Sequence, residues 1–177
     1  MIKVNKLLFI ERLQRERDKF ELLLNQVGFT RQMTMKGVSG NLSIKDLLAD
    51  ILAREQFIAD RLNEILHGEK YSPCTSYSAL EDFQGKYGYP DYESSFLEKE
   101  KLNHLVIDKH KNIGVDEIVS AELAAYSNIL AAFEKLTHNQ CLDHDVFYRV
   151  AEHTYRPYRR AGIEIRRWLK SLMTKSK

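Results

Sequence analysis

The chain has 177 residues, of which 44% are hydrophobic and 29% are charged, so it has the length of one domain and enough apolar side chains for one core. Its 27 basic and 25 acidic side chains leave a net charge of +2, which gives no electrostatic reason to expect a nucleic-acid partner or an anionic membrane surface. No apolar run approaches the roughly 20 residues that a membrane-spanning helix needs.

The N-terminal sequence and the cysteines predict a cytoplasmic protein. The apolar run at 7–10 ends at Glu11, which is too short for the hydrophobic segment of a secretory signal. Cys74 and Cys141 are too few for a disulfide framework or a metal-binding knuckle, so we expect two reduced thiols.

Helical periodicity governs the first part of the chain. A first segment ends near Gly28 and has one apolar face. A second begins at Ser43, whose hydroxyl can accept a hydrogen bond from a free N–H group of a helix start, as can the carboxylate of Asp46. It closes at Gly68. The apolar stripes are Phe9, Ile10, Leu13, Phe20, Leu23, Leu24 and Val27 in the first segment, and Leu48, Ile51, Leu52, Ile58, Leu62, Ile65 and Leu66 in the second.

From Gly68 to about Ser95 the periodicity breaks, and prolines and glycines lie among aromatic residues between Tyr71 and Tyr92. A long connection of this kind usually packs over another part of the protein. We interpret it as a cover for one end of a helical bundle. The alternatives are a lid over a pocket and a contact in a homodimer, because tyrosine is favoured where one end of a ring stays wet.

The second half of the chain is again helical. A shorter helix is predicted over 96–110, and a longer one opens at Asp116 and Glu117. The last helical stretch, 146–172, contains Pro157, which predicts a kink or a restart near Thr154. Together these segments predict an all-α protein: one domain over 1–177, folded as an antiparallel four-helix bundle with a long crossover that carries an extra short helix.

The sequence contains none of the familiar catalytic motifs. It has no glycine-rich phosphate loop and no Gly-x-Ser-x-Gly elbow. A Glu-x-x-His pair occurs once, at Glu64 and His67, whereas a di-iron bundle needs two. No two histidines are three or four residues apart, so no helix face offers a zinc site. We therefore expect no cofactor.

Three ionisable residues nevertheless lie on apolar helix stripes. Glu55 and Glu122 either pair with an arginine or tyrosine inside the bundle or line a polar pocket between helices. His153 follows Val146 and Val150 on one line, where it is either satisfied by a hydrogen bond or binds a ligand. The arginine-rich run from Arg156 to Lys170 is interpreted as a solvated helix face.

Three stretches resemble known proteins. Residues 43–55, SIKDLLADILARE, resemble the second-helix signature of the DinB-like superfamily. Residues 154–169, which include TYRPYRRA and IRRWL, resemble the ending of its ClbS/DfsB branch. The middle of the chain also fits, at 102–103, 109–111 and 115–119. The resemblance covers nearly the whole chain and implies a four-helix bundle.

In similar proteins three histidines hold a divalent metal, often nickel or zinc: one on the second helix and a His-x-x-x-His pair on the last. The corresponding positions here are Asp50, Pro157 and Ala161. Proline and alanine cannot bind a metal, so the resemblance implies a degenerate metal site. Arg54 stands where the family has a tryptophan, four residues after Asp50, and the two are expected to form an ion pair.

The resemblance also implies a function, because the colibactin-resistance member of this branch is linked to small-molecule hydrolysis. It favours a bundle that binds a small molecule in a resistance or detoxification role, and leaves open whether it catalyses a reaction. The alternatives are a metal- and thiol-dependent transferase and a non-catalytic interaction protein that dimerises. The candidate ligand-binding residues are Asp50, Arg54, Glu55, His153 and Tyr158.

Overall fold

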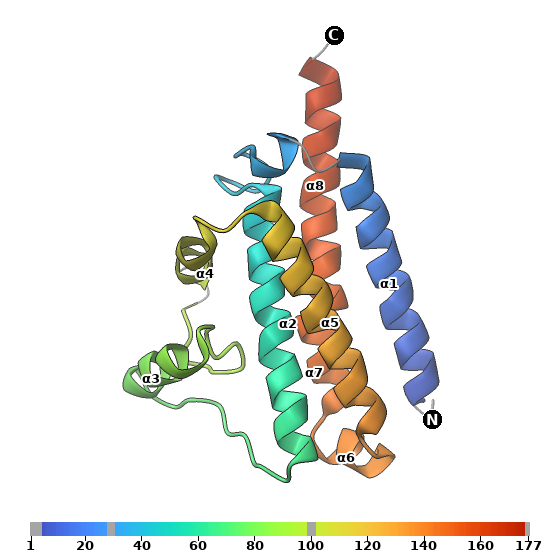
Figure 1. The fold of residues 1–177 in the computed structure, drawn as a ribbon, viewed down its shortest axis with the longest axis vertical. Helices are drawn as coiled ribbons and strands as arrows, with labels where there is room; N and C mark the ends of the chain where they lie inside the picture. The colour runs from blue at the N-terminus through green and yellow to red at the C-terminus, as the bar shows by residue number, and fades with distance from the viewer. Residues whose placement is uncertain (1–4, 28–30, 99–101, 176–177) are drawn as a thin grey trace.

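The computed structural model describes residues 5–27, 31–98 and 102–175, and the regular structure within these ranges is helical apart from one isolated bridge between Ser39 and Leu42. The all-α prediction is therefore confirmed. Four long helices lie side by side, with α1 and α8 running in one direction and α2 and α5 in the other (Figure 1). Their bounds are α1 Lys6–Val27, α2 Ile44–Leu66, α5 Val115–Lys135 and α8 Tyr155–Lys175.

Helix α2 is the centre of the fold and begins as its sequence predicts. The Ser43 hydroxyl accepts a hydrogen bond from the Asp46 N–H at 3.2 Å, and the Asp46 carboxylate accepts one from the Ser43 N–H at 2.9 Å. This reciprocal pair satisfies two N–H groups that a helix start otherwise leaves free. Helix α2 then packs against α5, α4, α7, α8 and the short 3-10 helix Arg31–Thr34. Its buried face supplies much of the core.

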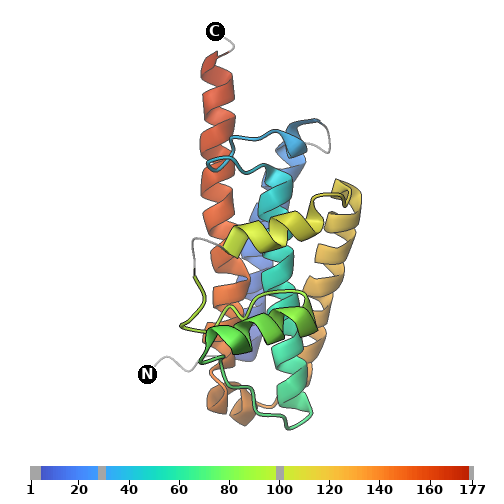
Figure 2. The same cartoon turned by 90° about the vertical axis from the view of Figure 1, so that its left-hand side faces the viewer.

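The crossover between α2 and α5 carries two short helices, α3 Tyr77–Tyr87 and α4 Leu102–His110. In Figure 2, α3 (green) and α4 (yellow) lie across the direction of the long helices. Only one short helix is predicted from the sequence, starting at 96. That start is wrong, since 96–98 are not helical and 99–101 lie outside the described residues. Helix α3 has a short apolar stripe, Leu80, Phe83 and Tyr87, which is only half-buried, and its ends are marked by the Ser76 cap and by the left-handed Gly88, with φ of 78°.

The last helical stretch is interrupted, as Pro157 predicts. Helix α7 spans Val146–His153, and α8 begins again after Thr154, whose φ and ψ are −127° and −92°. Pro157 then lies in the first turn of α8, where its missing N–H costs nothing. Thr154 does not cap α8 with its side chain, however, because its hydroxyl donates to the Val150 carbonyl at 2.6 Å. The short helix α6, His138–Asp143, is not predicted from the sequence. Among the described residues no helix is both long and apolar enough to cross a membrane.

Candidate functional site

One arginine and two glutamates meet at the centre of the four long helices. Arg17 of α1 holds Glu122 of α5 through two hydrogen bonds, of which the bond from Nη2 to Oε2 measures 2.5 Å. The same guanidinium lies 3.4 Å from Glu55 of α2 and donates to the hydroxyl of Tyr158 of α8 at 3.1 Å. Tyr158 in turn donates to Glu55 at 2.8 Å. Glu55 and Glu122 are therefore paired inside the bundle, the first of the two alternatives that the sequence leaves open.

Burial sets the charge states in this network. Glu55 is fully buried, and desolvation together with the neighbouring Glu122 raises the pKa of Glu55 well above its ordinary value. Burial opposes the charge of Arg17, but the hydrogen bonds that Arg17 donates to Glu122, together with the nearby Tyr158 and Glu55, outweigh it and raise the Arg17 pKa. The guanidinium also lies 4.0 Å from the centre of the Tyr126 ring. The network thus holds an Arg17–Glu122 ion pair beside a neutral Glu55 and ties four helices together, while Oε1 of Glu55 has no hydrogen-bond partner among the described residues.

A pocket of about 560 Å³ opens between α2, α7, the start of α8 and the crossover. It combines apolar side chains with Asp50, Arg54, Tyr92, His153 and Arg160. Pockets of this size and mixed character are typical of small-molecule sites between helices. The full lining is Ser39, Leu42, Leu47, Asp50, Ile51, Arg54, Tyr92, Ser94, Leu97, Glu152, His153, Pro157, Arg160, Ala161, Ile163 and Glu164.

The structure brings some of the predicted site residues together and separates others. Asp50, Arg54 and His153 line this pocket. Glu55 and Tyr158 do not line it, because both are buried in the core, where they form hydrogen bonds with each other and with Arg17.

Polar atoms without partners mark the wall of the pocket. Asp50 Oδ2 accepts a hydrogen bond from Arg54 Nε at 3.1 Å, the ion pair that the sequence predicts. The Arg54 guanidinium stacks on the ring of Tyr92, 4.6 Å from its centre. Among the described residues, nothing bonds to three buried atoms of the lining: Asp50 Oδ1, the Tyr92 hydroxyl and His153 Nδ1. Such atoms are costly to leave unmatched and point to a ligand that matches them.

His153 is buried, with 5% of its surface exposed, and packs against the ring of Phe57 with the ring centres 5.0 Å apart. Its Nε2 lies 3.8 Å from Glu93, which Arg149 holds through two hydrogen bonds of 2.8 and 2.7 Å. Burial by itself would raise the pKa of Glu93, but the interactions with His153 and Arg149 outweigh burial and lower this pKa to about 2. Burial lowers the pKa of His153 below its ordinary value, so the ring is neutral at neutral pH. With Nε2 turned to Glu93, Nδ1 is left as an acceptor.

The three-histidine metal site of the similar proteins does not fit the residues at the corresponding positions of this chain. Pro157 and Ala161 line the pocket but carry no donor atom, and Asp50 is paired with Arg54. Across the described ranges, no three His, Cys, Asp or Glu side chains are placed to hold a metal ion. The guanidinium of Arg54 is instead bound to Asp50, the carboxylate that a metal ion at this position would need.

The aromatic crossover packs onto α2. Arg61 of α2 is fully buried and lies between four rings, at 4.6 to 5.1 Å from each ring centre. These rings belong to Phe57, Tyr71, Phe83 and Tyr87. One guanidinium nitrogen also donates to Glu64 at 2.8 Å. The aromatic segment Tyr71–Tyr92 thus packs along the C-terminal half of α2 instead of over one end of the bundle, and Tyr92, which follows α3, forms part of the pocket wall.

Cys74 lies beside this cover and is not an activated thiol. Partial burial and Asp91 raise the pKa of Cys74 to about 11, so the thiol stays protonated at neutral pH. Asp91 is itself buried and accepts hydrogen bonds from the Cys74 N–H at 2.9 Å and from the Tyr71 hydroxyl. Its role is to organise the loop.

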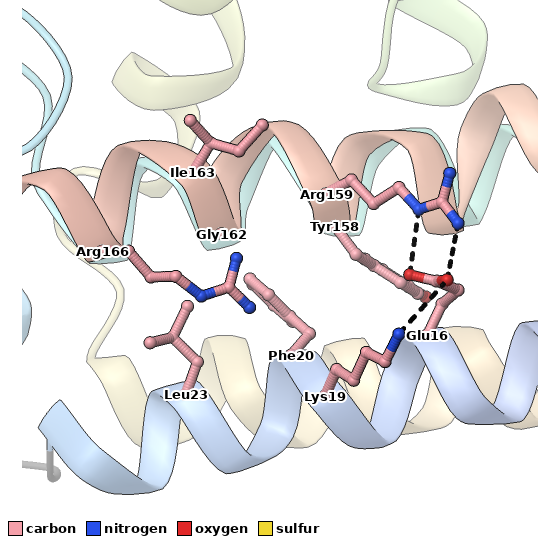
Figure 3. A pocket seen from close by; sticks show the side chains of 9 residues that line it. All are labelled: Glu16, Lys19, Phe20, Leu23, Tyr158, Arg159, Gly162, Ile163 and Arg166. Atoms are coloured by element: carbon pink, nitrogen blue, oxygen red, sulfur yellow. Dashed lines mark hydrogen bonds and ion pairs between the residues drawn. The ribbon is translucent and has the colours of Figure 1, made fainter.

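A second hollow, of about 300 Å³, lies between α1 and α8 (Figure 3). Its polar groups bond to one another: Arg159 donates to both oxygens of Glu16 at 3.0 and 2.6 Å, and Lys19 approaches the same carboxylate at 3.9 Å. The ring of Phe20 stacks on Tyr158 with the centres 5.4 Å apart. Because Glu16, Lys19 and Arg159 already pair with one another, this groove is a weaker candidate than the pocket beside α2.

Sequence reasoning misses Arg17, Tyr92 and Arg160. Arg17 follows Leu13 by four residues and precedes Phe20 by three, so its place on the apolar stripe is a usable signal. Arg160 was grouped with a solvated face, and it is exposed but lines the pocket. No periodicity places Tyr92, which belongs to a loop.

Comparisons with known proteins give information on the fold of this chain but not on its function. No family model matches the chain, and no curated protein matches it significantly. A solved structure with a similar fold is the crystal structure of an uncharacterised protein from Escherichia coli UTI89, with a TM-score of 0.65 and 11% identity over 96% of this chain and 95% of that chain. Similarity at this level of identity shows a shared fold only.

Proposed function

We propose that this chain binds a small molecule in the pocket between α2, α7, α8 and the part of the crossover that follows α3, without a resident metal ion. The observation that carries the proposal is the set of three buried, unmatched polar atoms on the wall: Asp50 Oδ1, the Tyr92 hydroxyl and His153 Nδ1. Leaving such an atom unpaired costs about 1–3 kcal/mol, and a ligand that bonds to it recovers that cost.

The wider setting is proposed on the resemblance alone. We propose that the chain is a DinB-like four-helix bundle of the ClbS/DfsB type whose metal site has degenerated, and that it acts in resistance or detoxification in the cytoplasm. The four long helices are compatible with such a bundle, and the Asp50–Arg54 ion pair lies where the metal site of the family would be. The pairing of Glu55 and Tyr158 in the core leaves them no part in the chemistry of the pocket.

The experiment that tests ligand binding is a fragment and metabolite screen by ligand-observed NMR on the full chain and on two pocket-filling variants. Ala161→Leu and Leu47→Trp each enlarge a side chain of the lining. We expect compounds that bind the wild type and lose binding in both variants. Circular dichroism and thermal melts check that the variants fold. If no compound depends on the pocket, the proposal is wrong.

The two alternatives have less support. A metal- and thiol-dependent transferase needs a donor set that Asp50, Pro157 and Ala161 do not supply; stoichiometric metal in protein purified without chelators would revive it. An interaction protein that forms a homodimer through Tyr71–Tyr92 needs rings that face outward. Instead most of these rings pack on Phe57 and Arg61. Light scattering measures the oligomeric state directly.

A further inference from the structure

Among the described residues, the charged side chains of the pocket lining are all paired except one. Each acidic side chain of the lining has an arginine partner in the structure. The pairs are Asp50–Arg54, Glu152–Arg156 and Glu164–Arg167. Arg160 also lines the pocket, and within the described residues it forms no hydrogen bond or ion pair. Arg160 is therefore the charged side chain of the lining that is left to bind a ligand.

The two arginines of the lining also have free donors. Arg54 uses Nε to bind Asp50, and its Nη groups form no hydrogen bond with any described residue. Arg54 is held in place on the ring of Tyr92, so its guanidinium is oriented in advance. Partial burial and the nearby charge of Arg54 lower the pKa of Arg160, while the carboxylate of Asp50 opposes this shift, so both arginines of the lining lie near each other and near Asp50. An anion placed between them relieves that repulsion.

The remaining groups specify a second feature of the ligand. Burial raises the pKa of Tyr92, so its unmatched hydroxyl keeps its proton and can donate to an anion. Asp50 Oδ1 and His153 Nδ1 are unmatched acceptors, which need an N–H or O–H group on the ligand. Apolar side chains complete the wall, among them Leu42, Leu47 and Leu97.

We propose that the ligand of this pocket is a small organic anion, held through its carboxylate or phosphate group by Arg160 and Arg54, that also carries a hydroxyl or amino group directed to Asp50 and His153. This inference rests on the proposed small-molecule function and specifies its ligand class. A guanidinium suits either anion, because its planar fork matches carboxylate and phosphate oxygens alike.

The test uses matched compounds that share one carbon skeleton and differ only in bearing a carboxylate, a phosphate, a neutral amide or an amine. They are screened against the wild type, Ala161→Leu and Leu47→Trp, and dissociation constants of the pocket-dependent binders are measured for Arg160→Gln. We expect these binders to be anions, and Arg160→Gln to weaken them about tenfold or more while leaving any neutral counterpart unchanged. The relative strength of the carboxylate and phosphate members identifies which anion the pocket prefers.

Arg166→Gln is the matched control, because Arg166 is exposed on the same helix and lines the groove of Figure 3 instead. It should bind like the wild type. Anions with a hydroxyl or amino group should bind more tightly than their unsubstituted counterparts, and equal affinity in these pairs overturns the second half of the proposal. If pocket-dependent binders include neutral and cationic compounds as often as anions, the charge inference fails while the proposed function stands. If nothing depends on the pocket, both fail.

Discussion

Replacing Arg17 by methionine tests whether the central network holds the helices together. Methionine keeps an unbranched apolar side chain in the core but removes the guanidinium. Glu122 then loses both of its hydrogen bonds while remaining 6% exposed, and Glu55 keeps only the bond from Tyr158. An uncompensated carboxylate is left among apolar side chains.

The expected cost follows from burial. Removing one partner of a buried ion pair typically destabilises a protein by about 3–5 kcal/mol, because the other charge stays desolvated. In a chain of this size each kcal/mol lowers the melting temperature by roughly 2–4 °C, which gives a drop on the order of 6–20 °C. The cost comes from Glu122, because the raised pKa of Glu55 keeps that side chain neutral.

The assay is urea unfolding followed by circular dichroism, with two reference variants. Arg15→Met removes an exposed arginine from the same helix and should change the free energy of unfolding by no more than about 0.5 kcal/mol. Adding Glu122→Gln to Arg17→Met removes the stranded charge and should restore much of the loss. A loss below about 1 kcal/mol in Arg17→Met, or no recovery in the double variant, would refute the reasoning.

Three further predictions concern other parts of the fold. The raised pKa of Glu55 means that its contribution to stability is complete below pH 4.5 and is lost as the pH rises from there through the folded-state pKa. Glu55→Gln should therefore gain stability relative to the wild type as the pH rises above 4.5. Arg61→Met should destabilise the chain by about 1–3 kcal/mol and speed amide hydrogen exchange in α3, because it removes the cation that four crossover and α2 rings surround. Gly162→Ala should stabilise it by about 0.5–1 kcal/mol, since a methyl group in this helix interior meets its neighbours at 3.4 Å or more (Figure 3).

Each of these has a clear contrary result. Parallel pH profiles for Glu55→Gln and the wild type would show that Glu55 is not neutral in the folded state. Unchanged exchange in α3 after Arg61→Met would mean that the rings hold the crossover without the cation. A destabilised Gly162→Ala would show that Leu23 and Arg166 cannot yield the space.

The individual helices could be predicted because their causes are local. The capping pair of Ser43 and Asp46, the apolar stripe of α2 and the break at Pro157 each act within a few residues. Helix α3 was not predicted because its apolar stripe, Leu80, Phe83 and Tyr87, is short and only half-buried, and lies within a connection rich in glycine and proline. The ion pair of Asp50 and Arg54 was predictable because four residues bring two side chains together on any helix.

The candidate site needed the tertiary structure, because its parts come from distant segments. Asp50 lies on α2, Tyr92 in the crossover and Arg160 on α8, and no spacing in the sequence relates them. The sequence alone showed that Glu55 and His153 lie on apolar stripes, but not what they face. Packing decided that: Arg17 and Tyr158 enclose Glu55 in the core, whereas His153 turns one nitrogen to Glu93 and leaves the other at the pocket wall. Periodicity records which face of a helix is buried, and only the packing of one helix against another determines its partners.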